Sequence, residues 1–298
     1  MGEAGTGRYL IAGAPFEAPP LAPGLYVVAT PIGNLRDITI RALETLAACD
    51  VVLCEDTRTS AKLLDHYDIR TPRSPLHEHN ERARIDGLLA DLAAGKRIAL
   101  ISDAGTPLIS DPGFPLVRAA QDAGAAIFAI PGASALLSAL SVAGLPTDSF
   151  GFHGFLPQKA GARNEAIAGL ASHRETLVFY ESPRRLVETL RAMSDTLGYD
   201  RPAAVALELT KRFERVYRGT LASLVLGLEE MDEIKGEAVI LVGGAIAVEI
   251  DPAAWRAALA AALEGQPLRA AVDEITEAFG LKRKDVYDAA LAIKAENT

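Results

Sequence analysis

The sequence has little cysteine and no long hydrophobic run. Its two cysteines, Cys49 and Cys54, have a spacing that fits neither a zinc motif nor a redox motif. We interpret both as small buried side chains of a protein in a reducing compartment, the cytoplasm. No stretch reaches the roughly 18 consecutive apolar residues that a membrane-spanning helix needs. These absences argue against a disulfide-stabilised secreted protein and against a membrane protein.

Several short functional motifs are also missing. There is no G-x-x-x-x-G-K-[ST], no G-x-G-x-x-G after a strand and no nucleophile elbow, which removes phosphoryl transfer and serine hydrolysis as leading functions. The spacing of His77 and His79 is not that of a helical zinc pair, so we expect no metal. Residues 1–24 lack the charged-then-apolar pattern of a secretory signal, and their Gly, Ala and Pro content predicts a flexible tail.

The bulk composition is that of an ordinary globular protein. Hydrophobic residues make up 49% and charged residues 23% of 298 residues, a length that predicts two domains. The formal net charge of −9 argues against a protein that is coated in nucleic acid. Net charge does not report local basic patches, so the placement of Lys and Arg decides this question.

From Leu25 onward, strand and helix signals alternate. Short apolar runs at 25–30, 50–54, 97–102 and 126–130 predict parallel strands of one α/β domain, residues 25–148, with helices on both faces. Ligands of such sheets bind at the carboxyl ends of the strands.

A second domain, residues 149–246, has strand-like runs at 150–155, 176–181, 203–209, 213–218 and 237–242. The short turn between its third and fourth runs predicts antiparallel pairing, and so a mixed α/β sheet. Residues 251–298 read as helices in a helix-turn-helix-like arrangement around Gly280.

The strongest chemical signal is the segment Ser102–Gly113, SDAGTPLISDPG, at the end of a predicted strand. Its small residues allow close approach of the backbone to a ligand, and Asp103 could accept hydrogen bonds from ribose hydroxyls or an amine. An ordinary tight turn needs fewer Asp and Pro residues, so we favour a ligand-binding loop. Two further strand ends carry TPIGN at 30–34 and IPGAS at 130–134, where Ser134 is either a plain helix cap or a ligand contact.

Three other strand ends place an acid before cations, at Glu55–Arg58, Glu181–Arg185 and Glu208–Arg212. The alternative for the first is a capping Thr57 beside a surface charge pair. Cations gathered at these loops would supply the basic patch that the net charge hides.

Together these motifs resemble the ribosomal RNA small-subunit methyltransferase I (RsmI) family, which has the tetrapyrrole-methylase fold. The resemblance covers roughly 25–242 and rests on seven segments: LYVVATPIGNLRD at 25–37, CEDTR at 54–58, SDAGTPLISDPG at 102–113, AGLP at 143–146, GFLPQK at 154–159, FYESP at 179–183 and ELTK at 208–211. The helical tail resembles the family's C-terminal extension more weakly.

The resemblance implies a homodimer of two α/β domains with S-adenosylmethionine in the cleft between them, and no metal. The implied reaction is 2′-O-methylation of a cytidine in the decoding region of 16S ribosomal RNA within the small ribosomal subunit. The family's cofactor contacts fall on residues that match its motifs, namely Pro31, Gly33, Asp103, Ala104, Gly105, Thr106, Ser134, Ala135, Glu181 and Leu209.

Methyl transfer to a ribose needs a group that takes the hydroxyl proton. We expect Asp56 or Glu181 to be that base, with Arg58 and Lys211 binding phosphate. The expected RNA contacts are Arg58, Lys159, Arg184, Arg185, Lys211, Lys282, Arg283 and Lys284. Ala133 and Leu207 depart from the family, which often has Pro and Arg there, and Leu207 puts an RNA contact at that position in doubt.

Two alternatives stay open. A tetrapyrrole C-methyltransferase of the same fold would share the cofactor loops, whereas the Lys282–Lys284 tail favours RNA. A non-catalytic RNA-binding ribosome assembly factor would leave those loops without a use, and cofactor binding would discriminate it.

Overall fold

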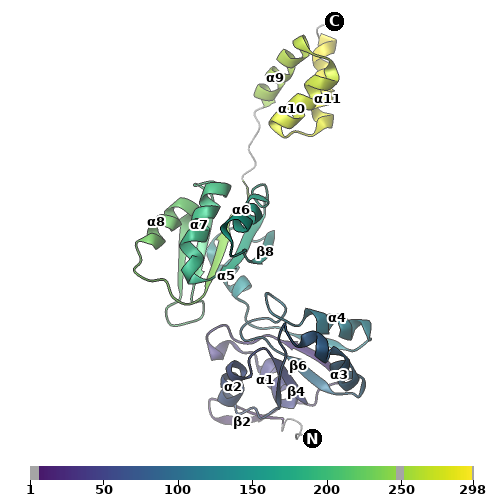
Figure 1. The fold of residues 1–298 in the computed structure, drawn as a ribbon, viewed down its shortest axis with the longest axis vertical. Coiled ribbons are helices and arrows are strands. Elements are labelled where there is room, and N and C mark those ends of the chain that lie inside the picture. Colours follow the sequence, from purple (N-terminus) through teal and green to yellow (C-terminus); the bar gives the residue numbers. More distant parts are fainter. Residues whose placement is uncertain (1–6, 246–251, 297–298) are drawn as a thin grey trace. The chain divides into compact units, whose positions relative to one another are not determined.

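The computed structural model describes residues 7–245 and 252–296, which form two compact units divided after Ala245 (Figure 1). The first unit contains two five-stranded sheets, and the second contains three helices. Within the described ranges, no helix is both long and apolar enough to cross a bilayer.

The expected flexible tail is wrong for residues 8–17, which form a β-hairpin of β1 (Arg8–Ile11) and β2 (Ala14–Glu17). Ala12 and Gly13 at its turn both have positive φ, the conformation of a tight two-residue hairpin turn. Tyr9, only 3% exposed, packs into the core beneath the first sheet. Because tertiary contacts anchor the hairpin, the amino-acid composition of this segment did not reveal that it is ordered.

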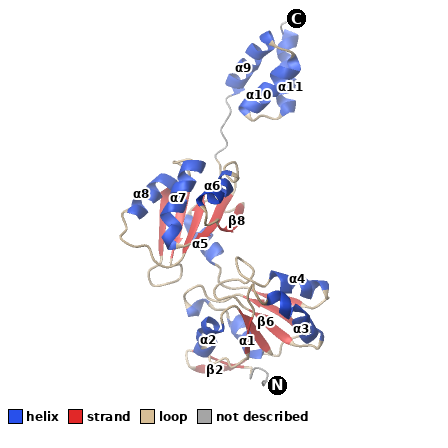
Figure 2. Ribbon diagram, viewed as in Figure 1, coloured by secondary structure: helices blue, strands red, loops and turns tan. Residues whose placement is uncertain are grey.

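The first sheet is wholly parallel, with the order β5-β4-β6-β3-β7. Its strands are β3 (Gly24–Val28), β4 (Val51–Cys54), β5 (Arg73–Pro75), β6 (Arg97–Leu100) and β7 (Ile127–Ile130). All but the short edge strand β5 were predicted. Helices α1 (Ile40–Ala48) and α2 (Thr57–His66) cover one face, and α3 (Glu81–Ala93) and α4 (Phe114–Asp122) cover the other (Figure 2).

The second sheet is mixed, as expected, with the order β11-β10-β12-β9-β8. Its strands are β8 (Phe150–Phe155), β9 (Thr176–Glu181), β10 (Pro202–Leu207), β11 (Arg215–Thr220) and β12 (Ala238–Val242). Only β8 and β9 pair in parallel, and β10 and β11 form the predicted antiparallel pair. Helices α6 (Ala160–Ala168), α7 (Pro183–Leu197) and α8 (Leu221–Glu229) pack on one face.

The other face of the second sheet is covered by α5 (Ala135–Ala143), which directly follows β7 of the first sheet. Ala139, Leu140 and Ala143 pack there against strands β9, β10 and β12. Ile32, from the loop after β3, joins the same apolar cluster. The chain therefore crosses between the sheets at the loops where the ligand site was expected.

The C-terminal unit contains α9 (Pro252–Gly265), α10 (Leu268–Phe279) and α11 (Arg283–Glu296) around a small core with Trp255. Gly280 ends α10 with a left-handed backbone, which gives the predicted helix, glycine turn and helix. Asp251, Asn297 and Thr298 of the expected helical segment lie outside the described residues.

Candidate active site

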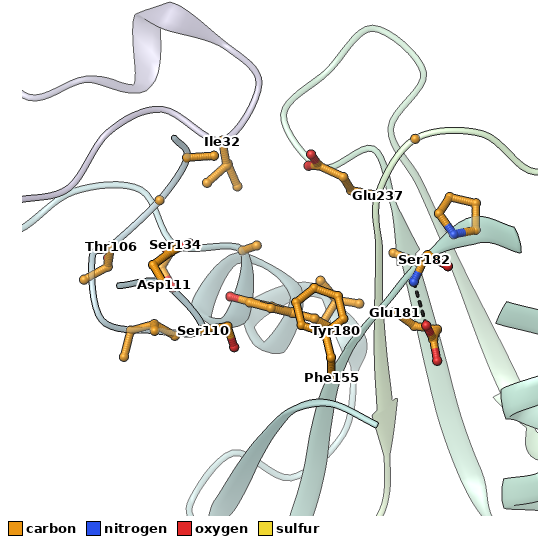
Figure 3. Close-up of a pocket in the computed structure, with 18 residues that line it drawn as sticks. Ile32, Thr106, Ser110, Asp111, Ser134, Phe155, Tyr180, Glu181, Ser182 and Glu237 are labelled. Carbon is orange, nitrogen blue, oxygen red and sulfur yellow. Dashed lines mark hydrogen bonds between the residues drawn. The ribbon is translucent and has the colours of Figure 1, made fainter. Parts of the chain in front are cut away.

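A cavity of about 330 Å³ lies at the carboxyl ends of β3, β6, β7, β8 and β9 (Figure 3). Loops from the first sheet form one side, and β9, β12 and the start of α7 form the other. Its volume falls in the range of small-molecule sites, which are mostly apolar with a few placed polar groups. The lining residues are Ile32, Ala104, Gly105, Thr106, Ile109, Ser110, Asp111, Ser134, Ala135, Phe155, Tyr180, Glu181, Ser182, Pro183, Gly236, Glu237, Ala238 and Val239.

The three loops of the first sheet are held together by hydrogen bonds. Thr30 and Gly105 exchange both backbone hydrogen bonds, at 2.8 and 3.0 Å. The Thr106 hydroxyl donates to the carbonyl of Ala133 at 3.3 Å. Gly105 has φ +80°, and an added Cβ would lie 3.3 Å from a methyl group of Ile32. The loops therefore form one fixed wall, and Gly105 is required where the backbone turns into the cavity.

The Ser102–Gly113 loop carries backbone strain. Leu108 and Ser110 both have positive φ, at +72° and +66°, although neither is glycine. Such conformations cost about 1–2 kcal/mol per residue and persist where the surroundings fix them, often at functional sites. An ordinary turn would not need two strained positions, so the strain supports the interpretation of this segment as a ligand loop.

Aromatic side chains from the second sheet form the opposite wall. The rings of Tyr180 and Phe155 pack edge to face, with centroids 5.7 Å apart. The Tyr180 hydroxyl accepts a hydrogen bond from the backbone N–H of Leu136 at 3.2 Å, so the ring reaches from β9 to the start of α5. Ser134 caps α5 with its hydroxyl, as the plain-cap alternative predicts, and it also lines the cavity, where its contact with a ligand stays a prediction.

Glu181 lies at the cavity wall, but its carboxylate is fully engaged. Its side chain is 1% exposed and forms an ion pair with Arg185 at 3.2 Å. One oxygen accepts the backbone N–H of Ser182 at 2.8 Å, and the other accepts the Thr189 hydroxyl at 2.7 Å (Figure 3 draws the first bond). This arrangement fixes the start of α7 at the cavity and leaves little capacity to take up a substrate proton.

Asp56 and Arg58 form a closed pair at the start of α2. The Asp56 carboxylate, not Thr57, caps this helix by accepting the backbone N–H of Arg58 at 2.8 Å. The Arg58 guanidinium also donates to it, and these bonds lower the pKa of Asp56 to about 2. A carboxylate with so low a pKa is a weak base, which argues against Asp56 in that role.

Asp111 also borders the cavity, and its pKa is shifted in the direction opposite to that of Asp56. Its pKa is raised to about 6, chiefly by burial and in addition by the nearby Glu55 and Asp103 carboxylates. Burial and Asp103 also raise the pKa of Glu55. A carboxyl group with a pKa near the working pH is suited to proton transfer.

Lys211 joins the two halves of the first unit. Its ammonium donates to Glu208 at 2.8 Å and to Glu237 at 3.2 Å. Its stem covers Gly33, where an added Cβ would lie 2.4 Å from Lys211 Cγ. Gly33 has φ +151°, so this position favours glycine for both reasons. Lys211 is thus held between two carboxylates, which argues against its expected role as a phosphate clamp.

The predicted cofactor contacts divide into two groups. Those that line the cavity are Ala104, Gly105, Thr106, Ser134, Ala135 and Glu181. Pro31, Gly33, Asp103 and Leu209 do not line it. Asp103 accepts the backbone N–H of Asp56 at 3.1 Å instead, and Leu209 borders a small adjoining hollow with Ile32.

Sequence reasoning missed five lining residues that matter for the geometry. Four of them lie inside motifs that the sequence analysis singled out, but nothing in those motifs indicated which positions face a ligand. These four are Ile32, Asp111, Phe155 and Tyr180. Glu237 lies in no motif and enters through the pairing of β12 with β9.

The expected RNA-contacting cations also differ in availability. Arg185 donates to the carbonyls of Leu156 and Pro157 and pairs with Glu181, so it stabilises the fold. Arg283 pairs with Asp273. The exposed members of the set are Arg58, Lys159, Arg184, Lys282, Arg283 and Lys284. Within the described residues, no group of three or more His, Cys, Asp or Glu side chains is arranged to hold a metal.

Comparison with known proteins defines the class first. Residues 24–225 match the family described as Tetrapyrrole (Corrin/Porphyrin) Methylases, and residues 249–294 match the RsmI C-terminal HTH domain. The fold is shared with the uroporphyrin-III-C-methyltransferase of Thermus thermophilus, with a TM-score of 0.53 and 23% identity over 74% of this chain and 93% of that chain. It is also shared with the methyltransferase CobJ, with a TM-score of 0.56 and 19% identity over 77% and 97%. A Thermus thermophilus uroporphyrin-III C-methyltransferase complexed with S-adenyl homocysteine gives a TM-score of 0.52 at 19% identity over 74% and 97%.

Relatives in sequence then define the family. The ribosomal RNA small subunit methyltransferase I of Mesorhizobium japonicum is 49% identical over 93% of this chain and 94% of its own length. The protein of the same name from Haemophilus influenzae is 45% identical over 90% and 96%. The chain belongs to the ribosomal RNA small subunit methyltransferase I family of tetrapyrrole methylases, which confirms the resemblance that the motifs gave.

Proposed function

We propose that this chain is a cytoplasmic, homodimeric S-adenosylmethionine-dependent methyltransferase that modifies the 2′-hydroxyl of a cytidine in the decoding region of 16S ribosomal RNA. The observation that carries this is the cavity at the strand carboxyl ends, which is lined largely by residues of the motifs on which the family resemblance rests. The relatives are named as methyltransferases of small-subunit ribosomal RNA.

The cavity fits the proposed cofactor. Ile32, Ala135 and Val239 offer apolar surface for an adenine ring, and the strained loop with Gly105 brings backbone amides and carbonyls to the wall. The carboxylates of Asp111 and Glu237 suit a ligand that carries positive charge. S-adenosylmethionine, when bound, supplies a methyl group already activated by its sulfonium, so no metal is required.

The residues of the chain then have two tasks, to align the ribose hydroxyl and to remove its proton. Asp111 is the better candidate base, because Asp56 is held by Arg58 and both oxygens of Glu181 are engaged. It lines the cavity, is only half-buried and has a pKa of about 6. Glu181 instead positions α7 at the cavity wall.

Exposed cations would bind the RNA backbone. Lys159 and Arg184 lie on the first unit with Arg58, whose side chain is 88% exposed although it pairs with Asp56. Lys282–Lys284 lie at the start of α11 in the C-terminal unit. Leu207, where the family often has Arg, is buried in the core of the second sheet. Phosphate contacts position RNA without reading its sequence, so base recognition must come from elsewhere.

The test is a methyl-transfer assay. Tritium-labelled S-adenosylmethionine is incubated with the protein and with small ribosomal subunits or naked 16S RNA from a strain that lacks the modification. Alkali-resistant label at one ribose is the expected result. Absence of label with intact cofactor binding by calorimetry would redirect the search to a tetrapyrrole acceptor, and absence of cofactor binding would indicate a non-catalytic RNA-binding protein.

A further inference from the structure

A second cavity, of about 650 Å³, borders the proposed cofactor cavity. The two share Ser110 and Asp111, so a ligand in the second cavity would reach the residue proposed as the base. The remaining lining residues are Glu55, Glu78, His79, Glu81, Arg82, Pro112, Gly113, Phe114 and Pro115. An acceptor has to lie beside the methyl donor, and this is a cavity in contact with the cofactor site.

Phe114 lines this cavity beside His79 and is 66% exposed. Its backbone is nonetheless fixed. Gly113 before it has φ +123° and packs so tightly that an added Cβ would lie 2.7 Å from Leu100. The buried Glu81 carboxylate accepts the backbone N–H of Leu116 at 3.1 Å. A solvent-exposed aromatic side chain on a fixed backbone is the kind of platform on which an unpaired RNA base stacks.

The charges of the cavity select which part of a nucleotide can enter. Glu55, Glu78 and Asp111 are all hydrogen-bond acceptors when ionised, and with the buried Glu81 they outnumber Arg82 and His79 in the lining, so the net charge disfavours phosphate. They suit the amino edge of a base. Cytosine presents a donating N4 amino group where uracil presents the O4 acceptor, and Glu or Asp is the natural partner of that amino group.

We propose that the second cavity receives the base of the acceptor cytidine, with its ring on Phe114 and its N4 amino group donating to the Glu55 and Glu78 carboxylates. The ribose then lies at Asp111, where the two cavities meet. This inference rests on the proposed function and adds to it the residues that select cytidine over uridine.

The test measures acceptor selectivity. The wild-type product is mapped first, and small subunits are then reconstituted with either C or U at the modified nucleotide. Single-turnover transfer by the wild type should favour C by about tenfold or more. Glu78→Gln and Glu55→Gln should reduce this ratio, because a glutamine amide can also donate to O4 of uracil.

Phe114→Ala should raise KM for the subunit by about tenfold with kcat nearly unchanged, and Phe114→Trp should restore it, because both effects follow from stacking. Matched controls are Glu165→Gln on α6 and Tyr199→Ala, a ring 61% exposed that lines neither cavity. Cofactor binding by calorimetry should stay at the wild-type value in every variant.

An unchanged C-to-U ratio in both glutamine variants, or a wild-type KM in Phe114→Ala, would overturn the inference while leaving the proposed function standing. Wild-type protein that binds the cofactor and labels no ribosomal RNA would instead reject the proposed function, and this base cavity with it.

Discussion

Replacing Asp111 with asparagine should make the protein more stable and much less active. Burial and the neighbouring carboxylates raise the pKa of Asp111 from 3.8 to about 6, so ionised Asp111 lowers the free energy of unfolding. At 1.36 kcal/mol per pKa unit the cost is roughly 3 kcal/mol, and solvent screening of a half-buried group reduces it to about 1 kcal/mol. Asparagine removes the charge and keeps nearly the same size and shape.

The sign of the pH dependence follows from proton uptake. As the pH falls, folded wild type binds a proton at Asp111 near pH 6, whereas the unfolded chain binds it only near pH 4. The wild type therefore gains stability from this group between about pH 6 and pH 4. The advantage of Asp111→Asn should be complete above about pH 6 and should vanish below about pH 4.

The assay is thermal unfolding at pH 8 and at pH 4, beside single-turnover methyl transfer. At pH 8, Asp111→Asn should raise Tm by about 2–4 °C and lower the transfer rate by about 10²–10⁴-fold. The wild-type kcat/KM should rise with pH through an inflection near 6, and Asp148→Asn, at an exposed site, should match the wild type. A variant that keeps more than about a tenth of the activity would refute the assignment of Asp111 as the base, and a variant that is less stable at pH 8 would refute the raised pKa.

Three further predictions concern other parts of the first unit. Gly105→Ala should cost about 1–2 kcal/mol of stability in thermal unfolding, because Gly105 has a positive φ. The same variant should bind the cofactor more weakly by calorimetry, and wild-type affinity would contradict the place of Gly105 in the cavity wall. Tyr9→Ala should lower the free energy of unfolding by about 3 kcal/mol because its ring is buried, and an unchanged Tm would mean that the hairpin is not anchored. Burial raises the pKa of Cys49 to about 12, so this thiol should resist iodoacetamide at pH 8 until the protein is unfolded. Rapid alkylation of Cys49 in the native protein, located by mass spectrometry, would contradict its burial.

The sequence predicted the architecture well because most of its signals are local. Apolar runs gave the strands of both sheets, apart from the three-residue edge strand β5, and Gly280 marked the turn between α10 and α11. Its clearest failure was the N-terminal hairpin, whose residues gain order from packing Tyr9 beneath a sheet formed later in the chain.

The motifs by themselves predicted which loops form the ligand site, because ligands of parallel sheets bind at the carboxyl ends of the strands and the motifs follow those ends. Only the tertiary structure decided the role of each side chain in those loops. Asp56, Glu181 and Asp111 are all acids at strand-end loops, yet one is held by an arginine, one is buried among donors and one lies between two cavities among other carboxylates. Proton affinity depends on burial and on charges brought close by folding, and neighbours in space such as Asp111 and Glu55 are not neighbours in sequence.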